Sequence, residues 1–194
     1  FSQCSSLEKV IIPNSLVKIN DFCFEGCKKL KSITIPSSVQ SIGNSIFIDC
    51  ESLTEISILP PIYSIGINFF KGCKSLKSCV IPSSVVDIGS NCFYECSSLE
   101  SIEIPSSVTS IGSNAFFGCI QLKKVTIPSS LTIIKIGVFR NCSSLEYLYI
   151  PSNVTSIGKM AFDGCKSLKK IEIPKTLTKF DKSFLPDQIK IIRY

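Results

Sequence analysis

The chain is built on a 23-residue internal repeat, and this period constrains its fold more than any other feature of the sequence. Three residue types recur together, eight times each, at that one step. The leucines are Leu7, Leu30, Leu53, Leu76, Leu99, Leu122, Leu145 and Leu168. The cysteines are Cys4, Cys27, Cys50, Cys73, Cys96, Cys119, Cys142 and Cys165. The phenylalanines are Phe1, Phe24, Phe47, Phe70, Phe93, Phe116, Phe139 and Phe162. A proline keeps nearly the same step, with one slip to Pro60 in the third unit. The pattern predicts eight similar stacked turns.

The fifth unit shows how one turn is built. Ile102 and Ile104 alternate with polar residues, which predicts a short strand whose two isoleucines point inward. Pro105 ends this strand because it has no N–H to donate and a fixed φ. Val108 and Ile111 supply a second inward row on the opposite wall. The following Gly112 suits a tight backbone bend.

The rest of each unit is expected on the outer side. Ala115, Phe116 and Cys119 are spaced for a single turn of α or 3₁₀ helix. One unit cannot bury its own apolar side, but stacked units cover one another. We therefore predict a mostly β repeat solenoid with a parallel sheet of about eight short strands on its concave side. Short second strands and single helical turns form the outer side, and strands about 4.8 Å apart give a sheet roughly 38 Å wide.

The unit Leu-x-x-Ile-x-Ile-Pro-x-x-Val-x-x-Ile-Gly-x-x-Ala-Phe-x-x-Cys resembles the BspA-like leucine-rich repeats, over essentially the whole chain. These repeats occur in bacterial surface proteins and in some parasitic protists. The family is similar to adhesins that bind host extracellular proteins. The resemblance therefore implies a cell-surface or secreted recognition protein, with a cytoplasmic location as the open alternative. No catalytic residues come with the family.

Residues 1–194 are expected to form a single solenoid domain. The chain opens in the middle of a repeat, so we expect it to be a fragment of a longer protein. Two units depart from the pattern, at Leu59-Pro60-Pro61 and at Ile134-Lys135. The last stretch, 180–194, loses the Gly and Cys and is expected to be a divergent C-terminal turn or cap that closes with a strand.

The cysteines are interpreted as core residues. Zinc sites cluster thiolates at short spacing, whereas these follow the repeat period. Buried free cysteine behaves as a small hydrophobe with a weak S–H donor. The alternative is disulfides between adjacent turns, because stacked Cα atoms about 4.8 Å apart fall within disulfide range. Cys23, Cys79 and Cys92 stand in slots that other units fill with Ala or Ile, so they are also expected in the core.

Composition argues against several classes of function. Histidine is absent, which removes the commonest general base, and the carboxylates form no recurring pair. No phosphate-binding Gly-rich loop is present, so we expect no enzyme activity, cofactor or metal. The net charge of +6 comes from scattered lysines, which argues against nucleic acid. No apolar run of about 18 residues exists, which argues against membrane insertion.

Two columns of residues should face outward from the strands, two and four residues after each repeat leucine. The first column is Lys9, Ser32, Glu55, Ser78, Ser101, Lys124, Tyr147 and Lys170, and the second is Ile11, Thr34, Ser57, Val80, Glu103, Thr126, Tyr149 and Glu172. Most are small and polar. Tyr147 and Tyr149, flanked by Lys124, Lys170 and Glu172, are therefore the candidate partner-binding residues, because tyrosine is a favoured interface anchor. The alternative is that aromatic residues simply suit exposed strands.

Two tripeptides, Asn141-Cys142-Ser143 and Asn153-Val154-Thr155, match the N-glycosylation signal of secreted eukaryotic proteins. Together these features predict a protein-interaction or adhesion module that contacts a protein partner, such as a host extracellular-matrix or cell-surface protein. The alternative function is a structural spacer in a longer surface protein, with no specific ligand on this segment.

Overall fold

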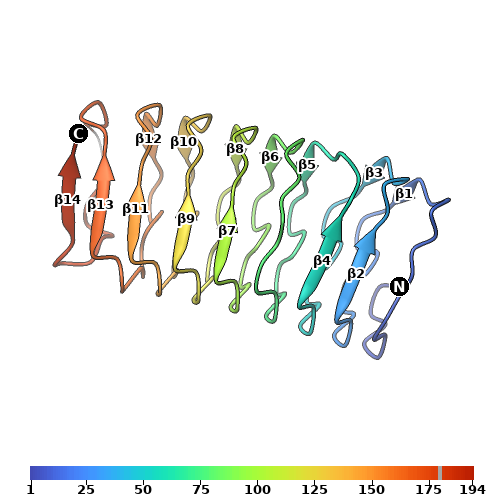
Figure 1. Cartoon of the computed structure of the whole chain (residues 1–194). Coiled ribbons are helices and arrows are strands. Elements are labelled where there is room, and N and C mark those ends of the chain that lie inside the picture. Colours follow the sequence, from blue (N-terminus) through green and yellow to red (C-terminus); the bar gives the residue numbers. More distant parts are fainter. Residues whose placement is uncertain (179–180) are drawn as a thin grey trace.

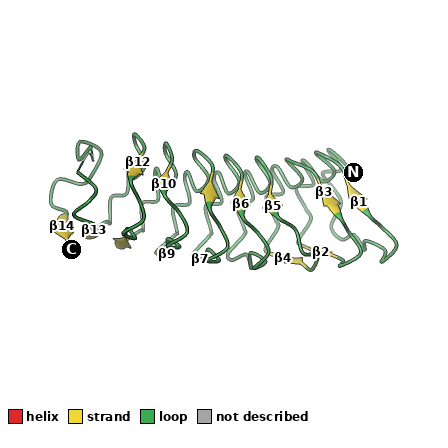
Figure 2. Cartoon of the chain, turned by 90° about the horizontal axis from the view of Figure 1, so that it is seen from above, coloured by secondary structure: helices red, strands yellow, loops and turns green. Residues whose placement is uncertain are grey.

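The chain folds into an elongated β-solenoid in the computed structural model, which describes residues 1–178 and 181–194. Successive turns stack side by side, and the two termini lie at opposite ends of the stack (Figure 1). Strands form two rows along this body, seen from the front in Figure 1 and from above in Figure 2. The predicted repeat solenoid with parallel strands is confirmed.

The first row holds the longer strands, which follow the repeat leucines. They are β2 (Ser32–Ile35), β4 (Glu55–Ile58), β7 (Ser101–Glu103), β9 (Lys124–Thr126), β11 (Tyr147–Tyr149), β13 (Lys170–Ile173) and β14 (Lys190–Arg193). The second row holds strands of two residues each. They are β1 (Lys18–Ile19), β3 (Ser41–Ile42), β5 (Ser64–Ile65), β6 (Asp87–Ile88), β8 (Ser110–Ile111), β10 (Ile133–Ile134) and β12 (Ser156–Ile157).

All strand pairs are parallel, and equivalent residues of neighbouring turns face each other. Ile102 of β7 pairs with Val125 of β9, for example, so the register shift between turns is one period of the repeat. The first row divides into three hydrogen-bonded pieces, β2-β4, β7-β9 and β11-β13-β14, with a bridge from Lys9 to Ser32. The segment 78–81 of the fourth turn, although expected to be a strand, lies in the row without strand geometry. Its inward Cys79 is smaller than the Ile, Val or Leu of the other turns.

The core is a set of ladders that run the length of the stack. The repeat phenylalanines stack from turn to turn with ring centroids between 5.2 and 6.0 Å apart. The repeat leucines from Leu30 onward are buried, as are the inward residues of both strand rows in the central turns, such as Ile102 and Val108. The inward slots predicted from the period are therefore confirmed. Phe1, at one end of the phenylalanine ladder, is 62% exposed.

The outer side forms tight turns, so the predicted single helical turns are wrong: no helix forms within residues 1–178 and 181–194. From Phe22 to Gly164, each outer turn contains two residues in the left-handed region, four positions apart, such as Asn114 (φ 56°) and Gly118 (φ 71°). Left-handed residues interrupt a right-handed helix. The backbone instead makes successive tight turns, and Phe116 N donates to Val138 O of the next turn.

The repeat glycine has a different role from the predicted bend. Gly112 does not have a positive φ, but a Cβ placed on it would overlap the backbone of Ser90 in the preceding turn. Gly158 meets the backbone of Ile136 in the same way. These glycines therefore allow two turns to approach closely at this corner of the solenoid.

The repeat cysteines tie each turn to its predecessor. Cys50 Sγ donates to Phe24 O at 3.1 Å, and the same contact, at 3.1–3.2 Å, recurs at every repeat cysteine from Cys27 to Cys165. Burial raises the pKa of the Cys50 thiol to about 12, which keeps it protonated and able to donate. The expected core position is confirmed for seven of the eight repeat cysteines, while Cys4 is exposed.

The remaining cysteines and the last segment complete the fold. Cys79 and Cys92 are buried as predicted, whereas Cys23 is only partly buried. All eleven cysteines, which all lie in the described part of the chain, are free. In the predicted C-terminal cap, 180–194, Phe180 lies outside the described residues. Within this stretch, β14 pairs in parallel with β13 and places Ile191 opposite Ile171, a shorter step than the regular period.

Candidate interaction surface

The predicted binding residues lie on the outward face of the first strand row. Tyr147 and Tyr149 flank the buried Leu148 on β11 and are 42% and 43% exposed. β13 lies directly beside β11, with Lys170 opposite Tyr147 and Glu172 opposite Tyr149. The alternation of inward and outward side chains thus brings four of the five predicted residues together on two paired strands.

Lys170 links the members of this group. Its ammonium lies 5.2 Å from the centroid of the Tyr147 ring, a cation–π contact, and pairs with the Glu172 carboxylate. The hydrogen bond with Glu172 raises the pKa of Lys170, and the same bond lowers the pKa of Glu172. Partial desolvation and then the negative charge of Glu172 raise the pKa of the Tyr147 phenol. Both residues of the Lys170–Glu172 pair are therefore charged at neutral pH.

A third tyrosine belongs to the same group and was missed by the sequence reasoning. Tyr194 follows β14, and its ring stacks on Tyr149 with centroids 5.2 Å apart and an interplanar angle of 17°. Its hydroxyl donates to Ile150 O at 2.6 Å, so the side chain reaches from β14 back to the turn of β11. We call Tyr147, Tyr149 and Tyr194, with Lys170 and Glu172, the sheet-face cluster.

The fifth predicted residue, Lys124, stands beside the cluster. It is exposed on β9, in the turn before β11, and lines a hollow of about 440 Å³ in the outward face. This hollow lies at the irregular segment 78–81 and is lined by Ser78, Cys79, Val80, Ser101, Ile102, Glu103, Ile104, Lys124 and Thr126. Val80 is 83% exposed. The outward face therefore offers an open hollow and an aromatic cluster, with Lys124 between them.

A second aromatic group lies on the outer turns, and the sequence reasoning missed it as well. Tyr94 and Phe117 stack at 4.5 Å with an interplanar angle of 4°. Lys71 lies over the Tyr94 ring and Arg140 over the Phe117 ring, at 5.5 and 5.8 Å from the centroids. Arg140 Nε also contacts Asp163 Oδ2 at 2.8 Å. These five residues follow one another at the repeat step, and we call them the turn-edge stack.

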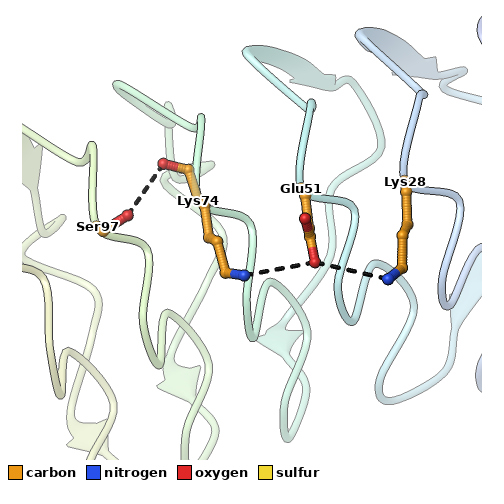
Figure 3. A network of polar contacts seen from close by, with 4 residues as sticks. All are labelled: Lys28, Glu51, Lys74 and Ser97. Carbon is orange, nitrogen blue, oxygen red and sulfur yellow. Dashed lines mark hydrogen bonds and ion pairs between the residues drawn. The ribbon is translucent and has the colours of Figure 1, made fainter.

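Charged residues form a shorter ladder on neighbouring outer turns (Figure 3). Glu51 Oε1 lies 3.8 Å from Lys28 Nζ and 3.4 Å from Lys74 Nζ, while Ser97 Oγ donates to Lys74 O. These groups are substantially exposed, and such surface ion pairs contribute little to stability. Lys28, Glu51 and Lys74 are therefore linked by ion pairs along the solenoid axis.

Asn141 and Asn153, the predicted glycosylation residues, are both exposed. Asn141 is left-handed (φ 60°) and its amide lies against Gly164 of the next turn, while the neighbouring Cys142 is buried. Asn153 Nδ2 donates to Ser129 O at 2.7 Å. Glycosylation at either residue stays a prediction.

Three features of the described residues bear on metal binding, membrane insertion and catalysis. Among residues 1–178 and 181–194, no three Cys, Asp or Glu side chains gather as metal ligands would. The same part of the chain contains no helix that is long and apolar enough to cross a membrane. Burial raises the pKa of the Cys79 and Cys165 thiols to about 12, which leaves them poor nucleophiles.

Comparison with known proteins places the chain among leucine-rich repeat proteins. The BspA-type leucine-rich repeat region, in its six-copy form, matches residues 1–109 and 63–192. No curated protein matches the chain. Because the matches span nearly all of its length, the chain belongs to the BspA-type leucine-rich repeat family.

Solved structures agree with this assignment. The chain is 32% identical to the leucine-rich repeat protein TpLRR of T. pallidum, with a TM-score of 0.76, over 90% of this chain and 80% of that one. It is 31% identical to a leucine-rich cell surface protein of Faecalibacterium prausnitzii, with a TM-score of 0.68, over 100% of this chain and 55% of that one. The pneumococcal vaccine antigen PcpA, at 21% identity and a TM-score of 0.58 over 92% of this chain and 60% of that one, shares the fold.

Proposed function

We propose that this chain is a protein-interaction module of the adhesion type, carried by a cell-surface or secreted protein, and that its partner contacts the outward face of the first strand row. Leucine-rich repeat proteins of this family are generally protein-interaction modules and typically not enzymes. The cell surface protein of F. prausnitzii supports the surface location. A host extracellular-matrix or cell-surface protein is the partner class that fits this setting.

One observation carries the choice of surface: the sheet-face cluster is the place where large rings lie open on a face of small polar residues. Tyr147 and Tyr149 are each more than two fifths exposed. Outward residues in the preceding turns, such as Ser78, Ser101 and Thr126, offer little area to desolvate. Interfaces draw most of their binding free energy from a few aromatic or arginine anchors. The cluster supplies such anchors and has polar groups at its margin.

The test begins with the intact chain as bait for solubilised extracellular matrix and for cell lysate, followed by identification of the captured protein. Affinities for that protein are then measured with Tyr147→Ala/Tyr149→Ala. Truncating a central aromatic anchor typically costs about 2 kcal/mol, so we expect affinity to fall about thirtyfold or more. The melting temperature should fall by only a few degrees, because the variant also loses the exposed contacts of the two rings with Lys170 and Tyr194.

The matched control removes two exposed apolar side chains beside the second strand row. Tyr63 and Val86 are 74% and 43% exposed there, on neighbouring turns. Tyr63→Ala/Val86→Ala should bind like the parent chain. If this control loses binding while the tyrosine variant keeps it, recognition uses the second row instead. A chain that captures no protein on any face behaves as a spacer.

A further inference from the structure

Charge is distributed unevenly along the first strand row. Around the sheet-face cluster, on β9 to β14 and the residues just before these strands, lysines outnumber carboxylates. The lysines are Lys123, Lys124, Lys169, Lys170 and Lys190, and the carboxylates are Glu146 and Glu172. The equivalent positions of the first five turns carry more carboxylates than lysines: Glu8, Glu55, Glu100 and Glu103 against Lys9, Lys31 and Lys77. The positive excess thus coincides with the aromatic cluster.

Two of these lysines flank the rings without a partner of their own. Lys170 is paired with Glu172 within the cluster. Lys124 on β9 and Lys190 on β14 are exposed and make no ion pair among the described residues. Because Lys190 stands opposite Lys170, it shares the outward face with Tyr147. The rings therefore have an unpaired cation on the strand before them and another on β14 beyond them.

The hollow and the cluster lie in line along the solenoid axis. Five strand spacings separate Val80, beside the hollow, from β14. At about 4.8 Å each, this distance is about 24 Å. An extended peptide advances about 3.3 Å per residue, so about seven residues cover it. A chain crossing the strands at right angles would meet the hollow, Lys124, Tyr147 and Lys190 in that order.

We propose that the partner presents an extended acidic segment of about seven to ten residues, which lies across the first-row strands from the hollow at Val80 to Tyr194. Carboxylates of this segment pair with Lys124 and Lys190, apolar or aromatic side chains pack on Tyr147 and Tyr149, and one side chain enters the hollow. This inference rests on the proposed function and adds to it the chemistry of the ligand.

The pattern of charges favours a peptide over a uniform polyanion. Glu103 lines the hollow and Glu172 lies between Tyr149 and β14, so carboxylates interrupt the lysines along the path. A nucleic acid or sulfated polysaccharide would place a negative charge against each of them, and like charges repel. A peptide avoids this because its side chains differ from one position to the next and can alternate acidic, apolar and neutral groups.

The experiment uses a random dodecapeptide library displayed on phage and selected against the intact chain at near-physiological salt. We expect the selected peptides to be enriched in Asp and Glu together with aromatic or aliphatic residues. Individual peptides, synthesised with a fluorophore, are then titrated with three variants. Lys124→Ala/Lys190→Ala should weaken binding about fivefold, which is about 1 kcal/mol in total, since exposed ion pairs are individually weak and each of the two contributes about half of it. Tyr147→Ala/Tyr149→Ala should abolish measurable binding.

The control, Lys9→Ala/Lys31→Ala, removes the same charge beside the same strand row in the first two turns, where Lys31 precedes β2 and pairs with Glu8, and should bind like the parent chain. Selected peptides without acidic enrichment, or equal affinity for the two lysine variants, would overturn the acidic ligand. In that case loss of binding in the tyrosine variant would still support the proposed function. Failure to select any peptide that the tyrosine variant rejects would count against both. Tighter binding of heparin than of any selected peptide would overturn the peptide and assign the face to a polyanionic carbohydrate.

Discussion

The two aromatic groups on the surface of this solenoid are built from similar residues but differ in what covers their rings. In the turn-edge stack, Tyr94 and Phe117 cover each other, and their other faces are covered by Lys71 and Arg140. In the sheet-face cluster, Tyr147 carries Lys170 on its ring, yet it stays 42% exposed. Rings whose faces are all occupied can hold neighbouring turns together. Rings left open have area to offer a partner, so we assign stability to the first group and recognition to the second.

That assignment requires a closed core beneath both groups. The labelling rates of the cysteine thiols test whether the core is closed, and they should show the largest effect. Burial raises the pKa of Cys50 from 9.0 to about 12, which lowers its thiolate fraction roughly a thousandfold at a given pH. We expect iodoacetamide at mildly alkaline pH to label the exposed Cys4 quickly and Cys50 on the order of a thousandfold more slowly, as measured by peptide mass spectrometry over time.

The same samples report whether the thiols are reduced. The expected intact mass before reduction is that of eleven free thiols, with full labelling after denaturation. A mass lower by two hydrogens for each pair would show disulfides between turns, and rapid labelling of Cys96 in the native protein would show that the core is open.

The next largest effect is expected in the free energy of unfolding, where a variant of a core ring is compared with a variant on the outward face. Phe116 is fully buried in the phenylalanine ladder, so Phe116→Ala should lower the free energy of unfolding by about 3–5 kcal/mol. Ser101→Ala, on the outward face, should stay within about 0.5 kcal/mol. Denaturant unfolding curves measure both. Indistinguishable curves for the two variants would show that our assignment of inward and outward positions is wrong.

The smallest effect is the difference in unfolding free energy between variants of the turn-edge stack and of the sheet-face cluster. Phe117→Ala removes a stacked ring and a cation–π contact and should cost about 1–2 kcal/mol of unfolding free energy. Tyr147→Ala removes an exposed cation–π contact and should cost about 0.5–1 kcal/mol. The same unfolding curves measure both. If Tyr147→Ala is the more destabilising of the two, the sheet-face cluster also has a structural role and the division drawn above does not hold.

Much of the fold could be predicted because the period fixes which residues share an environment. Once Ile102 and Ile104 were assigned inward, the outward positions of Tyr147 and Tyr149 followed by counting. The outer turns could not be read in this way. The left-handed positions are filled by residues as unlike as Phe22, Met160 and Gly164, so no single residue type marks them. The apolar spacing there fits a helix equally well, and the backbone decides otherwise.

The turn-edge stack and Tyr194, which the sequence reasoning missed, differ in whether the sequence contains a signal for them. Lys71, Tyr94, Phe117, Arg140 and Asp163 follow the repeat step, so reading the column after each repeat phenylalanine would have revealed the turn-edge stack. Tyr194 lies beyond the regular spacing, because β14 follows β13 at a shorter step than the other turns keep. Its contact with Tyr149 depends on how that shorter connection returns to the sheet. Tertiary structure was needed to place it.

The hydrogen bond from each repeat cysteine, Cys27 to Cys165, to a phenylalanine carbonyl in the preceding turn restricts changes of length to whole repeats. Substitutions inside a turn, such as the displaced Pro60, leave the count of residues unchanged, and Cys73 still reaches Phe47. A single inserted residue would instead move a thiol away from its acceptor. Removing residues 74–96, a whole period, would place Cys119 at the sequence separation from Phe70 that Cys96 has now. Variants of this chain should therefore differ in length by whole turns.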